Sequence, residues 1–249
     1  MEMTADRSDT LSPLFHPTSL AIIGASNNAA RIGGRPLQYT RDAGFAGRIY
    51  PINPNRESVQ GLPAFANIAD VPEPVDTAII AVPAAAVVET VEACAAAGVK
   101  AAVIFSAGFA ETGESGRQDQ IALGNIARAS GMRIVGPNCL GVYNAEHGFF
   151  GTFTSTIEAG WPKPGTVGLV SQSGAYGSHL SLLATLRGIG IRFWLTTGNE
   201  CDVDVAETIG WLAQQAGVSV IVAYAEGISD RERLFAALVL AHQHGKPVI

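Results

Sequence analysis

Two segments of the sequence place glycine and serine where an apolar run gives way to a helical pattern. Segment 24–26 reads Gly-Ala-Ser after the run 19–23, and segment 171–174 reads Ser-Gln-Ser-Gly after the run 166–170. Backbone N–H groups at such a turn face a ligand, and the dipole of the following helix favours a negative group there. We therefore predict an anion-binding turn at each segment, the second of them suited to a phosphate.

The first turn is an incomplete version of a dinucleotide-binding motif. Ser26 stands where the second glycine of G-x-G-x-x-G would be, so the alternative that Gly24 only makes a tight strand-to-helix turn stays open. NAD enzymes carry an acidic residue after the second strand, where this chain has Asn53. The neighbouring Asn55 and Arg56 suit a phosphorylated ribose better than a free one, which argues against NAD.

Three more apolar runs end in small or polar residues. These ends are Val82 and Pro83, then Ser106, Ala107, Gly108 and Phe109, and finally Asn138 and Cys139. Because parallel strands bring their carboxyl ends to one edge of a sheet, the ends predict a shared crevice for a ligand. Pro83 is equally well explained by a place in the first turn of a helix. Cys139 could be an activated thiol, but no histidine is near it in sequence, so a lining or packing role is favoured.

The second half of the chain offers acidic groups. Asp202 and Asp204 could form a carboxylate pair, yet both precede a helical pattern, so an N-cap and a first-turn acid are favoured. Glu226 directly follows an apolar run and stands at the carboxyl edge of that strand, where it could meet segment 171–174. The three cysteines lack the paired spacing of a zinc site, and no metal site is predicted.

The elements that must position these residues alternate in type. Short runs rich in Val and Ile are separated by stretches with helical spacing, which is the pattern of βαβ units. The predicted strands are 19–23, 48–52, 77–82, 101–105, 133–135, 166–170, 192–196, 218–224 and 247–249. Runs that are apolar along their whole length predict parallel strands covered by helices on both faces, so the fold class is α/β.

The strand–helix pattern pauses between residues 136 and 164, where Gly, Pro, Asn and Thr predominate, and this predicts a domain boundary. We predict a disordered N-terminus at 1–13, a first domain at 14–145, a linker at 146–164 and a second domain at 165–249. The second domain has only four predicted strands and stops on an apolar one. We therefore expect the chain to be a fragment, with this domain incomplete at its C-terminus.

Composition narrows the class of protein. Of 249 residues, 47% are apolar and 15% are charged, which is enough to bury a substantial core. The net charge of -6 comes without a basic block, which argues against nucleic acid as a partner. No uninterrupted apolar stretch reaches the roughly 18 residues that a membrane helix needs, and the first residues lack the apolar core of a signal peptide. We expect a cytoplasmic protein that does not contact a membrane.

Eight short motifs follow one another along the chain: GAS, YPINP, AVP, SAGFAETGE, GPNCLG, VGLVSQSGA, TTGNECDVD and YAEGI. Together they resemble the NDP-forming acyl-CoA synthetases, relatives of the succinyl-CoA synthetase α subunit. The resemblance implies a Rossmann-like CoA-binding domain followed by a flavodoxin-like domain, truncated here. It also implies an ADP-forming ligase that joins a carboxylic acid to CoA while ATP is cleaved, through an acyl phosphate and a phosphohistidine.

The resemblance further implies roles for the residues at the strand ends. CoA would be held by Gly24, Ala25, Ser26, Asn53, Pro54, Val82, Pro83, Ser106, Ala107, Gly108 and Phe109. Asn138 and Cys139 would lie near the thioester and acyl group. Ser171, Gln172, Ser173 and Gly174 would form a phosphate-binding helix start, and Glu226 would hold the phosphorylated histidine.

The segment that carries the phosphohistidine in that family has no counterpart among the five histidines of this sequence. We therefore expect the chain alone to be inactive as a ligase. ATP, ADP and Mg²⁺ would be bound by an ATP-grasp domain or subunit outside this chain, which implies a fusion or an oligomer. The sequence does not identify the carboxylic acid.

Two other functions stay open. A CoA-sensing module, as in related chains fused to an acetyltransferase, would share the CoA-binding motifs and would also lack the relay histidine. An NAD(P)-linked oxidoreductase would rest on the first βαβ unit alone, and the missing ribose-binding acid weakens it.

Overall fold

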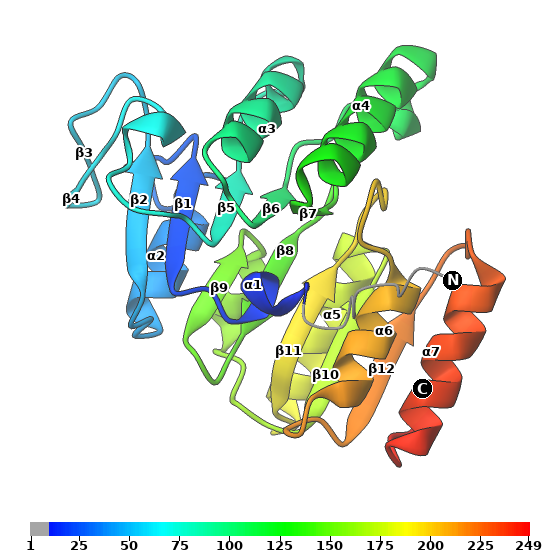
Figure 1. Ribbon diagram of the computed structural model, residues 1–249. Coiled ribbons are helices and arrows are strands. Elements are labelled where there is room, and N and C mark those ends of the chain that lie inside the picture. Colours follow the sequence, from blue (N-terminus) through cyan, green and yellow to red (C-terminus); the bar gives the residue numbers. More distant parts are fainter. Residues whose placement is uncertain (1–9) are drawn as a thin grey trace.

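The computed structural model describes residues 10–249, which form two β-sheets placed beside each other, each flanked by helices (Figure 1). The first sheet has the strand order β2-β1-β5-β6-β7, and all neighbours are parallel. Its strands are β1 (Ser19–Ile23), β2 (Arg48–Ile52), β5 (Thr77–Ile80), β6 (Ala101–Ile104) and β7 (Arg133–Val135). The α/β class predicted from the sequence is confirmed.

Both faces of the first sheet are buried, because successive side chains enter two different cores. Ala21 and Ile23 pack in the core beneath α3 and α4, whereas Leu20 and Ile22 pack on the opposite face with α2. These helices are α2 (Arg35–Asp42), α3 (Val87–Ala96) and α4 (Glu114–Ser130), and a hairpin of β3 (Ser58–Val59) and β4 (Leu62–Pro63) follows β2. Short 3₁₀ helices lie at Ile68–Asp70, Ala84–Ala86, Ala110–Thr112 and Ser155–Ala159. Such two-sided burial explains the uninterrupted apolar runs in the sequence.

The second sheet has the order β12-β10-β11-β8-β9. Its strands are β8 (Gly141–Asn144), β9 (Phe149–Thr152), β10 (Val167–Ser171), β11 (Ile191–Thr196) and β12 (Val220–Tyr224). Helix α5 (Gly174–Leu186) covers one face, and α6 (Val205–Gln214) and α7 (Arg231–Gln243) cover the other. Val248 pairs with Ile221 beside β12. Among residues 10–249, no helix combines the length and the apolar composition needed to cross a bilayer.

The hairpin of β8 and β9 differs from the expected parallel arrangement. Strand β8 runs antiparallel to β11, and β9 runs antiparallel to β8. Strand β9 and a 3₁₀ helix lie within 146–164, which the sequence predicts as a linker. Phe149 is buried in the core shared with the first sheet, while Phe150 lies 5.1 Å from the ring of Tyr143 on the other face. The alternation that makes this strand is only four residues long, so it does not stand out in the sequence.

Helix α1 (Ser12–Phe15) lies between the two halves of the molecule, the first built on the sheet β2-β1-β5-β6-β7 and the second on the sheet β12-β10-β11-β8-β9 (Figure 1). The ring of Phe15 stacks on Trp211 of α6 with 4.3 Å between centroids, and its carbonyl accepts a hydrogen bond from Asn144 of β8. Leu11 and Leu14 are buried in the same core. The disorder predicted for 1–13 is therefore wrong for residues 11–13, because Leu11 is buried in this core and Ser12 and Pro13 begin α1; residues 1–9 lie outside the described part of the chain.

An ion-paired arginine joins the end of the first sheet to the loop before α6. Arg133 of β7 contacts Asp202 at 3.0 Å and Glu207 at 2.7 Å, and its side chain is only 10% exposed. Asp204 caps α6 by accepting a hydrogen bond from the backbone N–H of Glu207. The favoured capping role of Asp204 is thus confirmed, and Asp202 serves the contact between the two halves. One continuous core runs through both.

Candidate functional site

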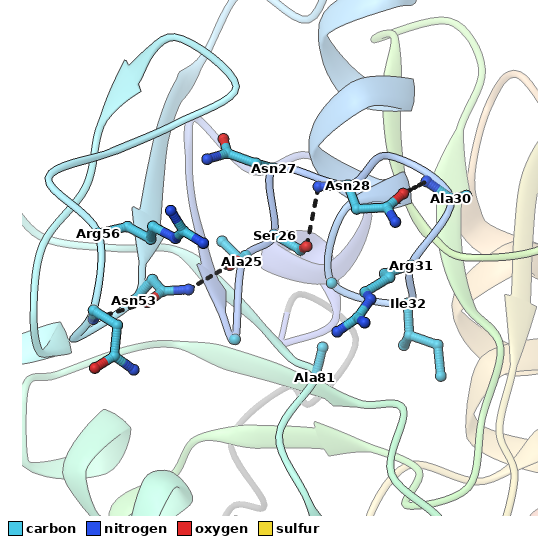
Figure 2. A pocket seen from close by; sticks show the side chains of 13 residues that line it. Ala25, Ser26, Asn27, Asn28, Ala30, Arg31, Ile32, Asn53, Arg56 and Ala81 are labelled. Carbon is cyan, nitrogen blue, oxygen red and sulfur yellow. Dashed lines mark hydrogen bonds between the residues drawn. The ribbon is translucent and has the colours of Figure 1, made fainter.

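A cleft of about 820 Å³ opens at the carboxyl ends of β1 and β2 (Figure 2). Four residues that the sequence predicts for CoA line it: Gly24, Ala25, Ser26 and Asn53. The cleft is also lined by residues that sequence reasoning did not select, among them Asn27, Asn28, Arg31 and Ile32. The site is therefore wider than the Gly-Ala-Ser turn and includes the loop that leads to α2.

Glycine is required at two points of this loop because backbone segments approach each other closely. Gly24 has φ +83°, and a Cβ atom there would lie 2.4 Å from the carbonyl oxygen of Ala81. A Cβ atom on Gly33 would lie 2.1 Å from the carbonyl oxygen of Gly24. Side chains at either position would force the backbone apart. The glycines thus serve the tight packing of the loop on β5.

The backbone N–H groups of segment 24–26 are already used inside the protein. Those of Gly24 and Ala25 donate to the carbonyl of Ile52, and that of Ser26 donates to the carbonyl of Gly33. Helix α2 begins only at Arg35, so its N-terminus does not directly follow the turn. This differs from the predicted anion-binding turn, because these three N–H groups do not face a ligand.

Two arginines supply positive charge to the cleft. Figure 2 shows the guanidinium groups of Arg31 and Arg56 on opposite sides of Ser26. Both side chains are exposed, and neither forms an ion pair within residues 10–249. Asn53 has a structural role, because its side-chain amide donates to the carbonyl of Ala25 at 2.8 Å. The arrangement suits a ligand with separated anionic groups.

The remaining residues predicted for CoA lie outside the lining of this cleft: Pro54 follows β2, and the others lie at the ends of β5 and β6. Pro83 precedes the 3₁₀ helix that leads into α3. Ser106 donates a hydrogen bond to the carbonyl of Val82, which ties the two strand ends together. Phe109 is fully buried, and the backbone N–H of Gly108 donates to the carboxylate of Glu111 at 2.6 Å. Their assignment to CoA stays a prediction.

Cys139 lies in a setting that suits packing. Its side chain is 2% exposed, and its thiol donates to the carbonyl of Ile104 at 3.2 Å. Burial raises the pKa of the thiol to about 12, so thiolate is scarce at neutral pH. The adjacent Asn138 is exposed, with φ +59°, and its amide donates to Asn199 at 3.3 Å. The structure places this predicted acyl loop against the second half of the molecule.

The predicted phosphate segment forms the junction of β10 and α5. Ser173 caps α5 by accepting a hydrogen bond from the backbone N–H of Tyr176 at 3.3 Å. The Ser171 hydroxyl donates to the carbonyl of Ser173 at 2.7 Å and fixes the turn. A Cβ atom on Gly174 would lie 2.7 Å from the Leu140 side chain, so a larger residue here would have to displace that side chain. The helix N-terminus expected from the sequence is present at 171–174.

Gln172 connects this turn to the predicted glutamate. Its Oε1 atom accepts hydrogen bonds from the backbone N–H groups of Glu226 at 2.5 Å and Gly227 at 3.0 Å. Its Nε2 atom donates to Glu200 at 2.9 Å. The Glu226 side chain is exposed to solvent. The structure thus brings 171–174 and Glu226 together, and it adds Glu200, which sequence reasoning did not assign a role.

The comparisons with known proteins agree with this two-part layout. Residues 18–145, just over half of the chain, match the model of a family described as a CoA binding domain. The chain belongs to this CoA-binding domain family. Residues 164–249 match the family described as a succinyl-CoA ligase like flavodoxin domain. The resemblance to the NDP-forming acyl-CoA synthetases, inferred from the eight motifs, is confirmed.

Named relatives are ligases or synthases that form CoA thioesters. A trans-feruloyl-CoA synthase from an unknown prokaryotic organism is 39% identical over 95% of this chain and 34% of its own length. The α subunit of an ADP-forming acetate–CoA ligase II from Pyrococcus furiosus is 37% identical over 96% of this chain and 51% of its own length. The crystal structure of PH0766 from Pyrococcus horikoshii has a TM-score of 0.89 and 35% identity, over 96% of this chain and 53% of that one. The chain therefore spans about a third to a half of the length of these relatives.

Proposed function

We propose that this chain is the CoA-binding part of an acid–CoA ligase that cleaves ATP to ADP and phosphate. The observation that carries the proposal is the cleft inside a domain of the CoA-binding family, with two arginines that form no ion pair within residues 10–249. CoA carries a diphosphate and a phosphorylated ribose, and two separated guanidinium groups match two separated anionic groups. The names of the relatives favour a ligase over a CoA-sensing module.

The chemical task divides between the two sheet edges. A carboxylate is a poor acyl donor until one of its oxygens is joined to phosphate, after which the thiol of CoA can displace that phosphate. In the proposed division, the cleft of the first sheet holds CoA, and Asn138 lies beside the reacting acyl group. Segment 171–174 and Glu226 then hold the phosphate that travels on a histidine.

ATP, ADP and Mg²⁺ belong in this proposal to an ATP-grasp domain or partner subunit. The relative from Pyrococcus furiosus is named an α subunit, which supports a partner for this chain as well. Within residues 10–249, no group of three or more His, Cys, Asp or Glu side chains is arranged to hold a metal ion. We also keep the prediction of a cytoplasmic protein.

Calorimetric titration of the chain with CoA, dephospho-CoA and NAD tests the proposal. We expect CoA to bind more tightly than dephospho-CoA by about tenfold, because the 3′-phosphate gains a charge-assisted contact. In Arg56→Ala this preference should disappear, whereas Arg48→Ala, on the opposite edge of the sheet, should retain it. Tighter binding of NAD than of CoA would overturn the proposal.

A further inference from the structure

Glu200 is a partly buried acid, and its hydrogen-bond partners all donate to it. Its Oε1 atom accepts from the Thr197 hydroxyl at 2.8 Å and from the backbone N–H of Val205 at 3.0 Å. Its Oε2 atom accepts from Nε2 of Gln172 at 2.9 Å. Burial raises the pKa of Glu200, and these three donors offset only part of that rise, so the pKa stays above its usual value. The N–H group of Val205 and Nε2 of Gln172 can only donate, so each oxygen of Glu200 has at least one partner that requires an acceptor.

The carboxamide of Gln172 can satisfy its neighbours in one orientation only. Its oxygen faces the two N–H groups of Glu226 and Gly227, and its nitrogen faces Glu200 and the carbonyl of Gly227. Turning the group over would set its NH₂ against two N–H groups and its oxygen against a carboxylate. Glu200 thus favours the orientation in which Gln172 anchors the backbone of Glu226.

The neighbouring Asn199 makes the equivalent connection toward the first half. Its amide nitrogen donates to Glu111 at 2.5 Å, and its oxygen accepts from Asn138 at 3.3 Å. The backbone is close as well, because a Cβ atom on Gly198 would lie 2.4 Å from the carbonyl oxygen of Pro137. One short loop therefore touches both the predicted acyl loop and, through Glu200, the phosphate turn.

We propose that Glu200 is a positioning residue that fixes the backbone of Glu226 against the phosphate turn by orienting the Gln172 carboxamide. The assignment rests on the proposed function in one respect, namely that segment 171–174 and Glu226 handle phosphate. The hydrogen-bond geometry itself does not depend on that function. Amide hydrogen exchange therefore tests the positioning role of Glu200, and turnover of the assembled ligase tests the proposed function.

The deciding variant is Glu200→Gln, which keeps the size of the side chain but replaces one acceptor by a donor. The new NH₂ group must face either the N–H group of Val205, beside the Thr197 hydroxyl, or Nε2 of Gln172, and both of these nitrogens can only donate. We expect hydrogen exchange of the Gln172 side-chain amide and of the Gly227 backbone amide to accelerate on the order of tenfold in NMR spectra of the chain. Assignment of the Gln172 signals comes from Gln172→Ala.

The matched control is Glu114→Gln. Glu114 accepts a hydrogen bond from Gln118 at 2.7 Å, so it is also a Glu–Gln pair, but an exposed one on α4. We expect this control to leave the signals of Gln172 and Gly227 unchanged. Unchanged exchange in Glu200→Gln as well would overturn the positioning role.

Exchanging both residues tests whether the effect travels through Gln172. In the double variant Glu200→Gln with Gln172→Glu, the new Gln can donate to the new Glu, whose other oxygen still accepts from Glu226 and Gly227. The carbonyl of Gly227 loses its donor and faces a carboxylate oxygen instead, so full recovery is not expected. We expect the Gly227 amide to recover at least half of its protection. No recovery would overturn the route through Gln172.

Turnover is measured on the assembled ligase with acetate or ferulate as the acid. We expect Glu200→Gln to lower kcat on the order of 10- to 100-fold and to leave the KM for CoA unchanged, because the CoA cleft is at the other edge. A wild-type chain that does not bind CoA in calorimetry would reject the proposed function while the exchange data still decide the geometry. A raised KM for CoA with an unchanged kcat would overturn the positioning role.

Discussion

The two sheet edges that carry the candidate site are built in opposite ways. At the first edge, a broad cleft exposes Arg31 and Arg56, and close backbone approaches at glycines shape the loop. At the second edge, Gln172, Glu200 and the backbone of Glu226 hold one another in a hydrogen-bonded cluster. The charged groups of the first edge are available to a large ligand. The polar groups of the second edge hydrogen-bond to one another and fix the position of the Glu226 backbone. A binding surface and a reacting centre would be expected to differ in this way.

The largest expected effect tests the dependence of the first edge on backbone contact. We predict that Gly33→Ala lowers the free energy of unfolding by about 3 kcal/mol and weakens CoA binding, because its Cβ would meet the carbonyl oxygen of Gly24, which cannot swing away. Denaturant unfolding measures the change. The matched change at the second edge is Gly227→Ala, where no atom lies within 4 Å of the added Cβ and little change is expected. Equal losses of unfolding free energy in Gly33→Ala and Gly227→Ala would contradict the difference between the two edges.

An intermediate effect tests the charge preference of the cleft. We predict that Ser26→Glu weakens CoA binding about tenfold, because it adds a negative charge between Arg31 and Arg56. Ser26→Ala is the control and should bind CoA nearly as the wild type does. Calorimetry gives both affinities. An unchanged affinity in the glutamate variant would remove this loop from the CoA site.

The smallest effect should leave both edges intact. Asp76 precedes β5, at the far end of the first sheet from the cleft. Burial raises the pKa of Asp76, but hydrogen bonds from Lys100 and Thr18 outweigh burial and lower the pKa to about 2. We predict that Asp76→Asn lowers the free energy of unfolding at pH 7 by about 1 kcal/mol, a figure reduced because Lys100 is largely exposed.

The sign of the pH dependence follows from the lowered pKa of Asp76. Its stabilisation is fully present above the unfolded value of 3.8 and is lost as the pH falls through about 2. The difference in free energy of unfolding between wild type and Asp76→Asn should therefore vanish as the pH falls from 3.8 to about 2. The affinity for CoA at pH 7 should be the same in both. A gap that widens toward low pH would contradict the assignment.

The sequence predicted the parallel strands well, because strands buried on both faces leave continuous apolar runs. It did not predict the hairpin of β8 and β9, whose inward and outward residues alternate over only four positions. Arg31, two residues before Gly33, was missed because nothing in the local sequence indicates that its side chain lines the cleft. Glu200 was missed for a different reason, since its partners Gln172 and Val205 meet it only after folding.

Helix α1 also has a consequence for the timing of synthesis. Phe15 is made about 200 residues before Trp211, on which it stacks. At roughly 5–20 residues per second, that interval is about 10–40 seconds. During this time the apolar face of Leu14 and Phe15 is without its final partner, so the nascent first half passes through a period in which a chaperone could shield it.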